Sequence, residues 1–273
     1  MGLWLAVTLG GLQGLTEFLP VSSSGHLRLV EGFAGVEEPA TLFDIMLHVG
    51  TLLAVVIVYR KRLGDILVSL FRLSGRGARL SEEPNARLFF YLLLAMIPTG
   101  VIGLSLGDTT EGWAKDLKFV GGALLVNGVL LLWMGKIYRV RKGAGRDLDS
   151  LRARDALIIG TGQGLGIFRG ISRSGVTITA GLGTGLSQEA AAAFSFLLSI
   201  PAILAALVLK VGEGGLDGVS VEVLLAGTLT SAVVGVVALK WLLRLLNQGH
   251  LHRFAWYCFA LGAVAITAEL IQG

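Results

Sequence analysis

Residues 13–26 read QGLTEFLPVSSSGH, and residues 163–176 read QGLGIFRGISRSGV. Seven of the fourteen aligned positions are identical without a gap, from the shared Gln-Gly-Leu to the shared Ser and Gly near the end. Each copy follows an apolar segment, passes a helix breaker (Pro20 in one, Gly170 in the other) and ends in a serine-containing turn. A duplicated motif of this kind indicates that the chain is built from two related halves.

The composition is that of a membrane protein. Hydrophobic residues make up 53% and charged residues 15% of the 273 residues, with a mean hydropathy of +0.74, whereas soluble domains carry about 25% charged residues. A helix needs about 20 mostly apolar residues to cross a bilayer. The candidate spans lie near residues 42–59, 88–107, 119–137, 190–210, 220–243 and 254–271. We therefore predict an all-α polytopic membrane protein with six transmembrane helices.

The positive charge follows the connections between these spans. The formal net charge is +4, but Lys and Arg are not interleaved with aromatic residues, so no nucleic-acid partner is expected. The connections 60–87, 136–154 and 240–253 hold 17 of the 23 Lys and Arg residues, which predicts that they lie in the cytoplasm. No cleaved signal peptide is expected. Membrane lipids are expected partners, and a homodimer is among the candidate assemblies.

Two apolar stretches are interrupted by polar groups and breakers. In residues 2–34 the carboxylate of Glu17 precedes Pro20, and residues 155–184 contain the second copy of the motif. A lipid-facing span does not tolerate a carboxylate or bare backbone at depth. We predict that both stretches are re-entrant helix-turn-helix hairpins.

The predicted orientation relates the two halves. With the basic connections inside, the first half starts outside and ends inside, and the second half does the reverse. We predict a single membrane domain, 1–273, made of two inverted-topology repeats, 1–140 and 151–273. The two hairpins then enter from opposite faces and meet near the middle of the membrane, which brings Glu17, His26 and Arg173 together.

Arg173 is the most informative single residue, because a guanidinium at membrane depth needs a paired anion or a water-filled cavity. It lies in SRSGVT, which adds three hydroxyl groups at the start of a helix. Arginine, hydroxyl and free backbone N–H groups are how proteins hold phosphate oxygens. The sequence therefore predicts a phosphate site formed by Arg173 with Ser172, Ser174 and Thr177.

The first hairpin supplies the complementary groups. It carries Ser22, Ser23 and Ser24, and then His26, a residue suited to proton transfer near neutral pH. Glu17 could act as a general base, orient the histidine or bind a divalent metal ion that bridges phosphates. Phosphoryl transfer needs little beyond positioned charge and a positioned nucleophile.

Each of these residues also has a structural interpretation. Glu17 and Arg173 would form a buried ion pair between the halves, the serines would cap helices, and His26 would be a hydrogen-bonded core residue. Asp44 and His48, four residues apart, are either a second polar pair near the site or a local helix contact, and the spacing favours the local contact. The functional interpretation is preferred because the costly intramembrane polar groups fall in the two duplicated loops.

At these residues the chain resembles the undecaprenyl-diphosphate phosphatases, the membrane family that also gives resistance to bacitracin. Residues 13–17 match the family's (E/Q)xxxE signature, and residues 18–26 match FLPVSSxGH. The second signature, PGxSRSxxT, is matched from residue 170 to residue 177, and FSFLLSIP at 194–201 is also typical of the family. The resemblance runs from end to end.

The resemblance implies hydrolysis of undecaprenyl diphosphate to undecaprenyl phosphate and inorganic phosphate, which recycles the lipid carrier for cell-wall glycan synthesis. It implies that Glu17 and Gln13 are linked to a divalent cation, Mg²⁺ or Ca²⁺. Ser23 and His26 would take nucleophilic or acid–base roles, and Arg173 would bind phosphate. The other substrate-binding residues would be Gln13, Ser22, Ser24, Arg169, Ser172, Ser174 and Thr177. The site would open to the extracytoplasmic side of the cell membrane.

Arg169 stands where the family pattern has proline, which removes a φ restraint and adds a cation beside the phosphate site. Gln13 takes the glutamine option of its motif, which leaves one carboxylate fewer for a metal ion. The competing hypothesis is a polyprenyl-phosphate transporter or flippase, because inverted repeats with interrupted helices are typical of secondary transporters. A carrier has no need of His26 beside a serine nucleophile, which favours the hydrolase.

Overall fold

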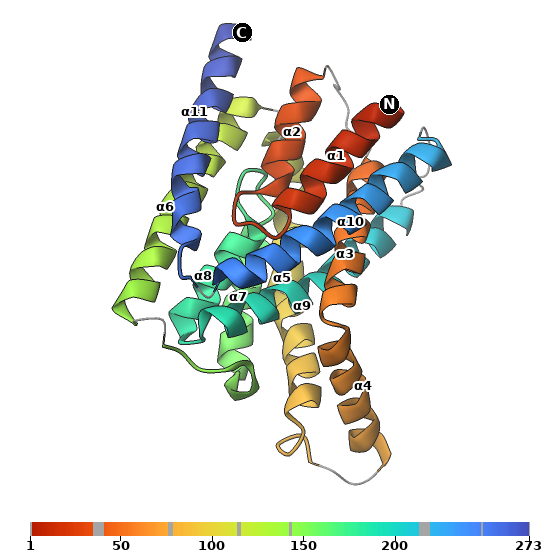
Figure 1. Cartoon of the computed structure of the whole chain (residues 1–273), viewed down its shortest axis with the longest axis vertical. Helices are drawn as coiled ribbons and strands as arrows, with labels where there is room; N and C mark the ends of the chain where they lie inside the picture. Colours follow the sequence, from red (N-terminus) through yellow and green to blue (C-terminus); the bar gives the residue numbers. More distant parts are fainter. Residues whose placement is uncertain are drawn as a thin grey trace.

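The computed structural model describes residues 2–34, 41–75, 79–113, 116–141, 144–212, 219–246 and 248–272. Its first half contains α1 (Leu3–Thr16), α2 (Ser23–Phe33), α3 (Thr41–Val58), α4 (Arg60–Gly75), α5 (Pro84–Trp113) and α6 (Leu117–Val140) (Figure 1). Its second half contains α7 (Ala153–Leu165), α8 (Arg173–Thr184), α9 (Gln188–Gly212), α10 (Val221–Leu246) and α11 (Phe254–Gln272). Two single 3₁₀ turns, η1 (Leu148–Ser150) and η2 (Leu251–Arg253), complete the described elements. The prediction of an all-α protein is confirmed.

The long helices have the length and composition of membrane spans. Among the described residues, five helices qualify, namely α5, α6, α9, α10 and α11. The α3 and α4 helices pass the same test only together, and a bend of 75° separates them. Large apolar side chains such as Leu104 and Val208 are exposed on the outside, as expected for a surface that faces lipid. The chain is a multi-pass membrane protein, and its described residues contain five candidate spans, or six if the bent pair counts as one.

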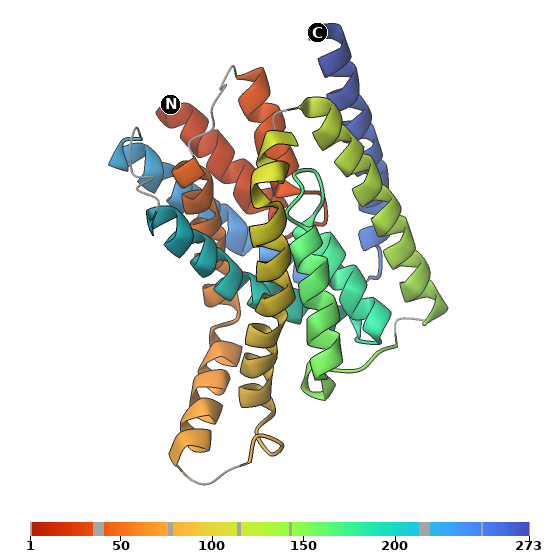
Figure 2. The same ribbon diagram turned by 180° about the vertical axis from the view of Figure 1, so that it is seen from behind.

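Two pairs of helices are too short to cross a bilayer. The α1, α2, α7 and α8 helices have 14, 11, 13 and 12 residues. At 1.5 Å per residue they are about 17–21 Å long, against a hydrocarbon core of about 30 Å. Both ribbon views show the α1–α2 turn and the α7–α8 turn meeting near the middle of the molecule from opposite ends (Figures 1 and 2).

One short helix of each pair packs against the opposite half of the chain. The α1 helix lies on α10, and α7 lies on α5. At Gly10 an added Cβ would collide with the carbonyl oxygen of Gly227, and at Gly160 it would collide with that of Ala95. Small residues let membrane helices approach this closely. A third contact, between α6 and α11, joins the last helices of the two halves.

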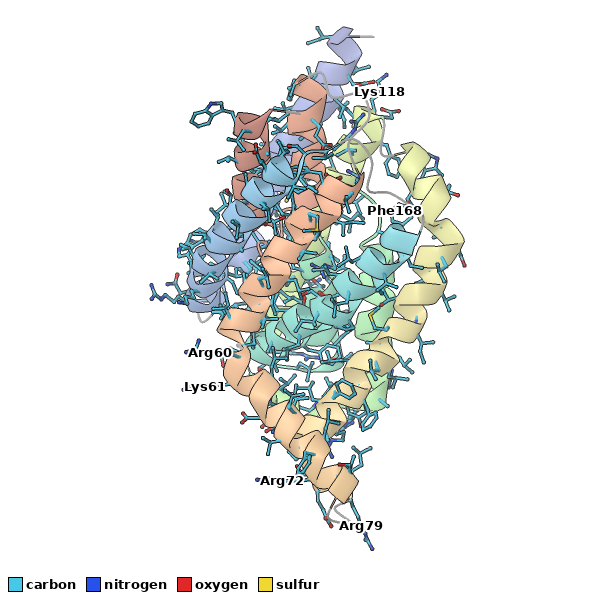
Figure 3. The ribbon with its side chains drawn as sticks, turned by 90° about the vertical axis from the view of Figure 1, so that its right-hand side faces the viewer. Arg60, Lys61, Arg72, Arg79, Lys118 and Phe168 are labelled. Carbon is cyan, nitrogen blue, oxygen red and sulfur yellow. The ribbon has the colours of Figure 1, made fainter. Side chains whose placement is uncertain are left out.

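The labelled basic residues are unevenly distributed between the two ends of the molecule. Arg60, Lys61, Arg72 and Arg79 lie at the end formed by α4, whereas Lys118 lies at the opposite end (Figure 3). The N-terminus and the C-terminus both lie toward the Lys118 end (Figure 1). This distribution agrees with the predicted grouping of basic residues on one side.

Candidate active site

The two duplicated loops contact each other directly. We call residues 13–26, which include the turn between α1 and α2, loop one, and residues 163–176, which include the turn between α7 and α8, loop two. The hydroxyl oxygen of Ser22 accepts a hydrogen bond from the backbone N–H of Gly170 (3.2 Å). In return, the Ser174 hydroxyl at the start of α8 donates to the carbonyl oxygen of Leu19 (3.2 Å). Each loop therefore stabilises the backbone of the other, and the predicted meeting of the duplicated loops is confirmed.

In each loop a serine caps the helix that follows the turn. Ser22 Oγ accepts from the N–H of Gly25 (3.2 Å), and Ser172 Oγ accepts from the N–H of Gly175 (3.1 Å). These are N-cap bonds, which satisfy N–H groups that the first turn of a helix leaves without partners. The structural interpretation of these two serines is thus confirmed, although both also line the cavity described next.

A cavity of about 420 Å³ opens beside the paired loops. Its polar wall consists of Glu17, Ser22, Ser23, Ser24, Asp44, His48, Thr110, Arg169, Ser172 and Arg173. Its apolar wall consists of Leu27, Ile45, Ile167, Ile171, Ala202, Ile203 and Ala206. A cavity lined by both charged and aliphatic side chains suits a ligand with a charged head and a hydrocarbon tail.

Glu17 is the centre of the polar wall. One carboxylate oxygen, Oε2, accepts from Gln13 Nε2 (2.8 Å) and from Ser23 Oγ (2.7 Å), and the other, Oε1, accepts from Arg173 Nη2. The carboxylate is buried, and the Arg173 side chain is 24% exposed. The predicted meeting of Glu17 and Arg173 from opposite halves is confirmed.

The imidazole beside Glu17 is His48 on α3. Its Nε2 lies 3.7 Å from Glu17 Oε2, and His48 lines the cavity. Its Nδ1 lies 2.8 Å from the carbonyl oxygen of Asp44, which can only accept, so Nδ1 carries a proton and Nε2 faces the site. The local helix contact expected for Asp44 and His48 exists, but both side chains also belong to the site. The spacing of four residues indicated the local contact but not that both side chains would line the cavity.

His26 lies outside the cavity, contrary to the expectation that it would join Glu17 and Arg173 there. Its Nδ1 donates to the carbonyl oxygen of Ser22 (2.7 Å), and its Nε2 accepts from the hydroxyl of Tyr257 on α11 (2.7 Å). The two rings are nearly parallel, with centroids 5.5 Å apart. Both ring nitrogens of His26 therefore already have protein partners.

A second guanidinium lies on loop two. Arg169 Nη2 is 3.4 Å from Asp44 Oδ2, and both residues line the cavity. The next residue, Gly170, has φ +104°, a left-handed conformation that strains any residue with a Cβ. Loop two thus places two arginines at the cavity, each paired with a carboxylate of the first half.

Three other predicted site residues do not line the cavity. Gln13 contacts it only through Glu17. Ser174 is used in the contact between the loops. Thr177 is fully buried, and its hydroxyl lies 2.6 Å from that of Ser195 on α9.

The donors around Glu17 do not form a preorganised metal site. In the part of the chain that the structure describes, no group of three or more His, Cys, Asp and Glu side chains could hold a metal ion. Glu17 already accepts from an amide, a hydroxyl and a guanidinium, and Gln13 turns its Nε2 rather than its Oε1 toward the carboxylate. A cation at Glu17 would compete with Arg173 for the same oxygens. We therefore assign no step of the reaction to a metal ion.

Comparison with known proteins shows the family of this chain. Residues 6–264 match the family described as "Bacitracin resistance protein BacA". The chain belongs to this family. The undecaprenyl-diphosphatase of Desulfatibacillum aliphaticivorans is 42% identical over 98% of this chain and 99% of its own length. Those of Desulfosudis oleivorans and Thermobifida fusca are 45% and 38% identical over 95% and 96% of this chain and 96% and 88% of their own.

Proposed function

We propose that this chain hydrolyses undecaprenyl diphosphate to undecaprenyl phosphate and inorganic phosphate. The observation that carries the proposal is the array Ser23–Glu17–Arg173 on the wall of a cavity in a membrane protein of this family. A hydroxyl bonded to a carboxylate beside a guanidinium is the arrangement that phosphoryl transfer needs. The relatives that share this length and identity carry the name of the same activity.

In the proposed reaction, Ser23 Oγ attacks the terminal phosphorus and Glu17 takes its proton, since their oxygens are already 2.7 Å apart. A bond forms between Ser23 Oγ and phosphorus, and the bond from phosphorus to the bridging oxygen breaks, so undecaprenyl phosphate leaves. Water then attacks the phosphorus of the phosphoserine, the bond from phosphorus to Ser23 Oγ breaks, and inorganic phosphate leaves. Ser23 Oγ takes back the proton held by Glu17. Arg173 exchanges its carboxylate partner for phosphate oxygens whose charge it stabilises.

The remaining cavity groups fit the rest of the substrate. Arg169, paired with Asp44, supplies a second cation for a headgroup that has two phosphoryl groups. The aliphatic wall, with Ile45, Ile171 and Ile203, suits the first isoprene unit. Ser22, Ser24 and Ser172 also line the cavity near the proposed headgroup position. His48 is positioned to protonate the leaving oxygen or to activate the hydrolytic water.

We also propose that residues 1–140 and 151–273 form inverted-topology repeats in one membrane domain of the cell membrane. Two observations support this proposal. The α1 helix packs against α10 and α7 packs against α5, so each contact joins helices of opposite halves. The α1–α2 turn and the α7–α8 turn approach each other from opposite ends of the molecule (Figure 1). The separation of cations between the ends supports cytoplasmic placement of the α4 end. With that orientation, the site is proposed to open to the extracytoplasmic side.

We propose that a divalent ion, Mg²⁺ or Ca²⁺, binds to this chain only together with the substrate. Because the oxygens of Glu17 are occupied by donors, we expect the ion to bind with the diphosphate oxygens rather than before them. Elemental analysis of dialysed, substrate-free protein is expected to find well under one Mg²⁺ or Ca²⁺ per chain. One tightly held ion per chain would show that Glu17 and Gln13 rearrange to form a resident site.

The direct test is phosphate release by the purified full-length chain in detergent, with undecaprenyl diphosphate as substrate and added Mg²⁺ or Ca²⁺. Release by the natural chain, and its loss in Glu17→Ala and Arg173→Ala, are expected. In ¹⁸O-water with acid quenching, a phosphoserine at position 23 should be trapped in a single turnover. A chain that moves labelled lipid between leaflets without releasing phosphate would instead be a transporter.

A further inference from the structure

The helix pair α6–α11 lies behind the two loops and contacts both of them through polar side chains. The two helices pack along each other, as both ribbon views show (Figures 1 and 2). Neither helix carries a residue of the duplicated motifs, and none of their side chains lines the cavity. Two of their residues nevertheless make short hydrogen bonds into the site region, namely Asn127 on α6 and Tyr257 on α11.

Asn127 connects the two loops to each other. Its Nδ2 donates to the carbonyl oxygen of Pro20 in loop one (2.9 Å), and its Oδ1 accepts from the N–H of Ser172 in loop two (3.0 Å). The residue is fully buried. One bond therefore ends three residues before Ser23, and the other ends on the residue before Arg173.

Tyr257 acts on loop one through His26. Its hydroxyl donates to His26 Nε2, and the opposite ring nitrogen donates to the carbonyl oxygen of Ser22, both at 2.7 Å. Ser22 has φ +67° and ψ +90°, and it is the one non-glycine residue in the described ranges with a positive φ. Such a conformation persists only where surrounding bonds determine it. The next residue is Ser23, whose hydroxyl donates a hydrogen bond to the carboxylate of Glu17.

We propose that Asn127 and Tyr257 are positioning residues that set the distance and direction of the Ser23 hydroxyl and the Arg173 guanidinium across the cavity. They touch neither the substrate nor the reacting atoms. In this assignment His26 is also a positioning residue, because Tyr257 reaches Ser22 only through its ring. The inference rests on the proposed phosphatase activity and extends it to a helix pair outside the motifs.

Two variants test this assignment. Tyr257→Phe removes only the hydroxyl from a side chain that is 47% exposed, so the fold is expected to survive. Asn127→Leu keeps the branched shape of the side chain and removes both bonds to the loops. Displacements of an ångström or less at reacting groups cost rate rather than affinity. We expect kcat to fall about 3- to 10-fold in Tyr257→Phe and about 10- to 100-fold in Asn127→Leu, with KM within about twofold in both.

Matched controls separate positioning from a loss of folded protein. Trp256→Phe changes the neighbouring exposed aromatic of α11, and Met134→Leu changes a buried residue about two turns along α6. Both controls are expected to keep the kcat of the natural chain. Melting temperature and elution as a single species are measured for every variant.

The outcomes distinguish this inference from the proposed function. If the natural chain releases no phosphate, the proposed function fails first. If it does, a folded Tyr257→Phe or a folded Asn127→Leu with unchanged kcat overturns the inference. A loss of rate that only parallels a loss of folded protein, or one that appears in KM alone, also overturns it.

Discussion

Loop one and loop two share seven of fourteen residues, yet their backbone conformations differ, and so do the polar side chains that they place at the cavity. In loop one the capping serine, Ser22, has φ +67° and ψ +90°, whereas its counterpart Ser172 has φ −82° and ψ +115°. Loop two places its left-handed residue at Gly170, where no Cβ is strained. After the cap, loop one continues with Ser23 and loop two with Arg173. Both loops keep the cap, but only loop one holds a non-glycine residue in a strained conformation.

The difference indicates a division of roles. Strain at a residue next to a reactive group is commonly retained because it fixes that group in place. Ser22 receives bonds on its hydroxyl from Gly25 and Gly170, and on its carbonyl from the ring and the backbone N–H of His26. Loop two does not need a strained backbone before Arg173, because a long arginine side chain can adjust its own position. We infer that loop one carries the nucleophile and the base, and loop two carries the cations that bind the headgroup.

The largest expected effect is a difference in kcat between variants of two neighbouring serines of loop one, Ser23 and Ser24. Ser23→Ala removes the hydroxyl that bonds to Glu17, so kcat for phosphate release is expected to fall about 10³-fold or more. Ser24→Ala is the matched control. Its hydroxyl is 3.4 Å from that of Ser22, and a change of no more than a few-fold is expected. Equal losses in the two variants would contradict the assignment of Ser23 as nucleophile.

A smaller effect is expected at His48, which belongs to neither loop. His48→Ala removes the imidazole beside Glu17, and kcat is expected to fall about 10- to 100-fold, at the lower end of general acid–base contributions. His48→Gln retains hydrogen-bonding groups without proton transfer and should restore little rate. His250→Ala, an exposed histidine that does not line the cavity, should leave kcat unchanged. Full rate in His48→Gln would limit His48 to hydrogen bonding.

The smallest effect is expected at the second cation of loop two. Arg169→Ala removes one of two guanidinium groups and leaves Asp44 without its partner, so KM for the diphosphate should rise about fivefold with kcat nearly constant. Steady-state kinetics over a range of lipid concentrations measures both constants. Arg72→Ala, at the far end of the molecule, is the control (Figure 3). A fall in kcat without a change in KM would place Arg169 in the chemical step instead.

The sequence predicted the meeting of the loops and the pairing of Glu17 with Arg173, because charged groups at membrane depth have few alternatives. It did not predict which histidine faces the carboxylate. That choice depends on the rotation of α3 and α2 about their axes, and each histidine bonds to the carbonyl four residues before it, so local spacing does not distinguish them. Asn127 and Tyr257 were missed because a single polar residue in an apolar span leaves no repeated pattern.

The central claim is that Glu17 and Arg173, from opposite halves of the chain, act together on one substrate. A double-mutant cycle of Glu17→Gln and Arg173→Lys, with kcat/KM for phosphate release as the readout, tests it most directly. Groups that act as a unit are strongly non-additive. We predict that the double variant will be within about threefold of the worse single variant. A double variant whose loss equals the product of the two single losses would contradict a shared site.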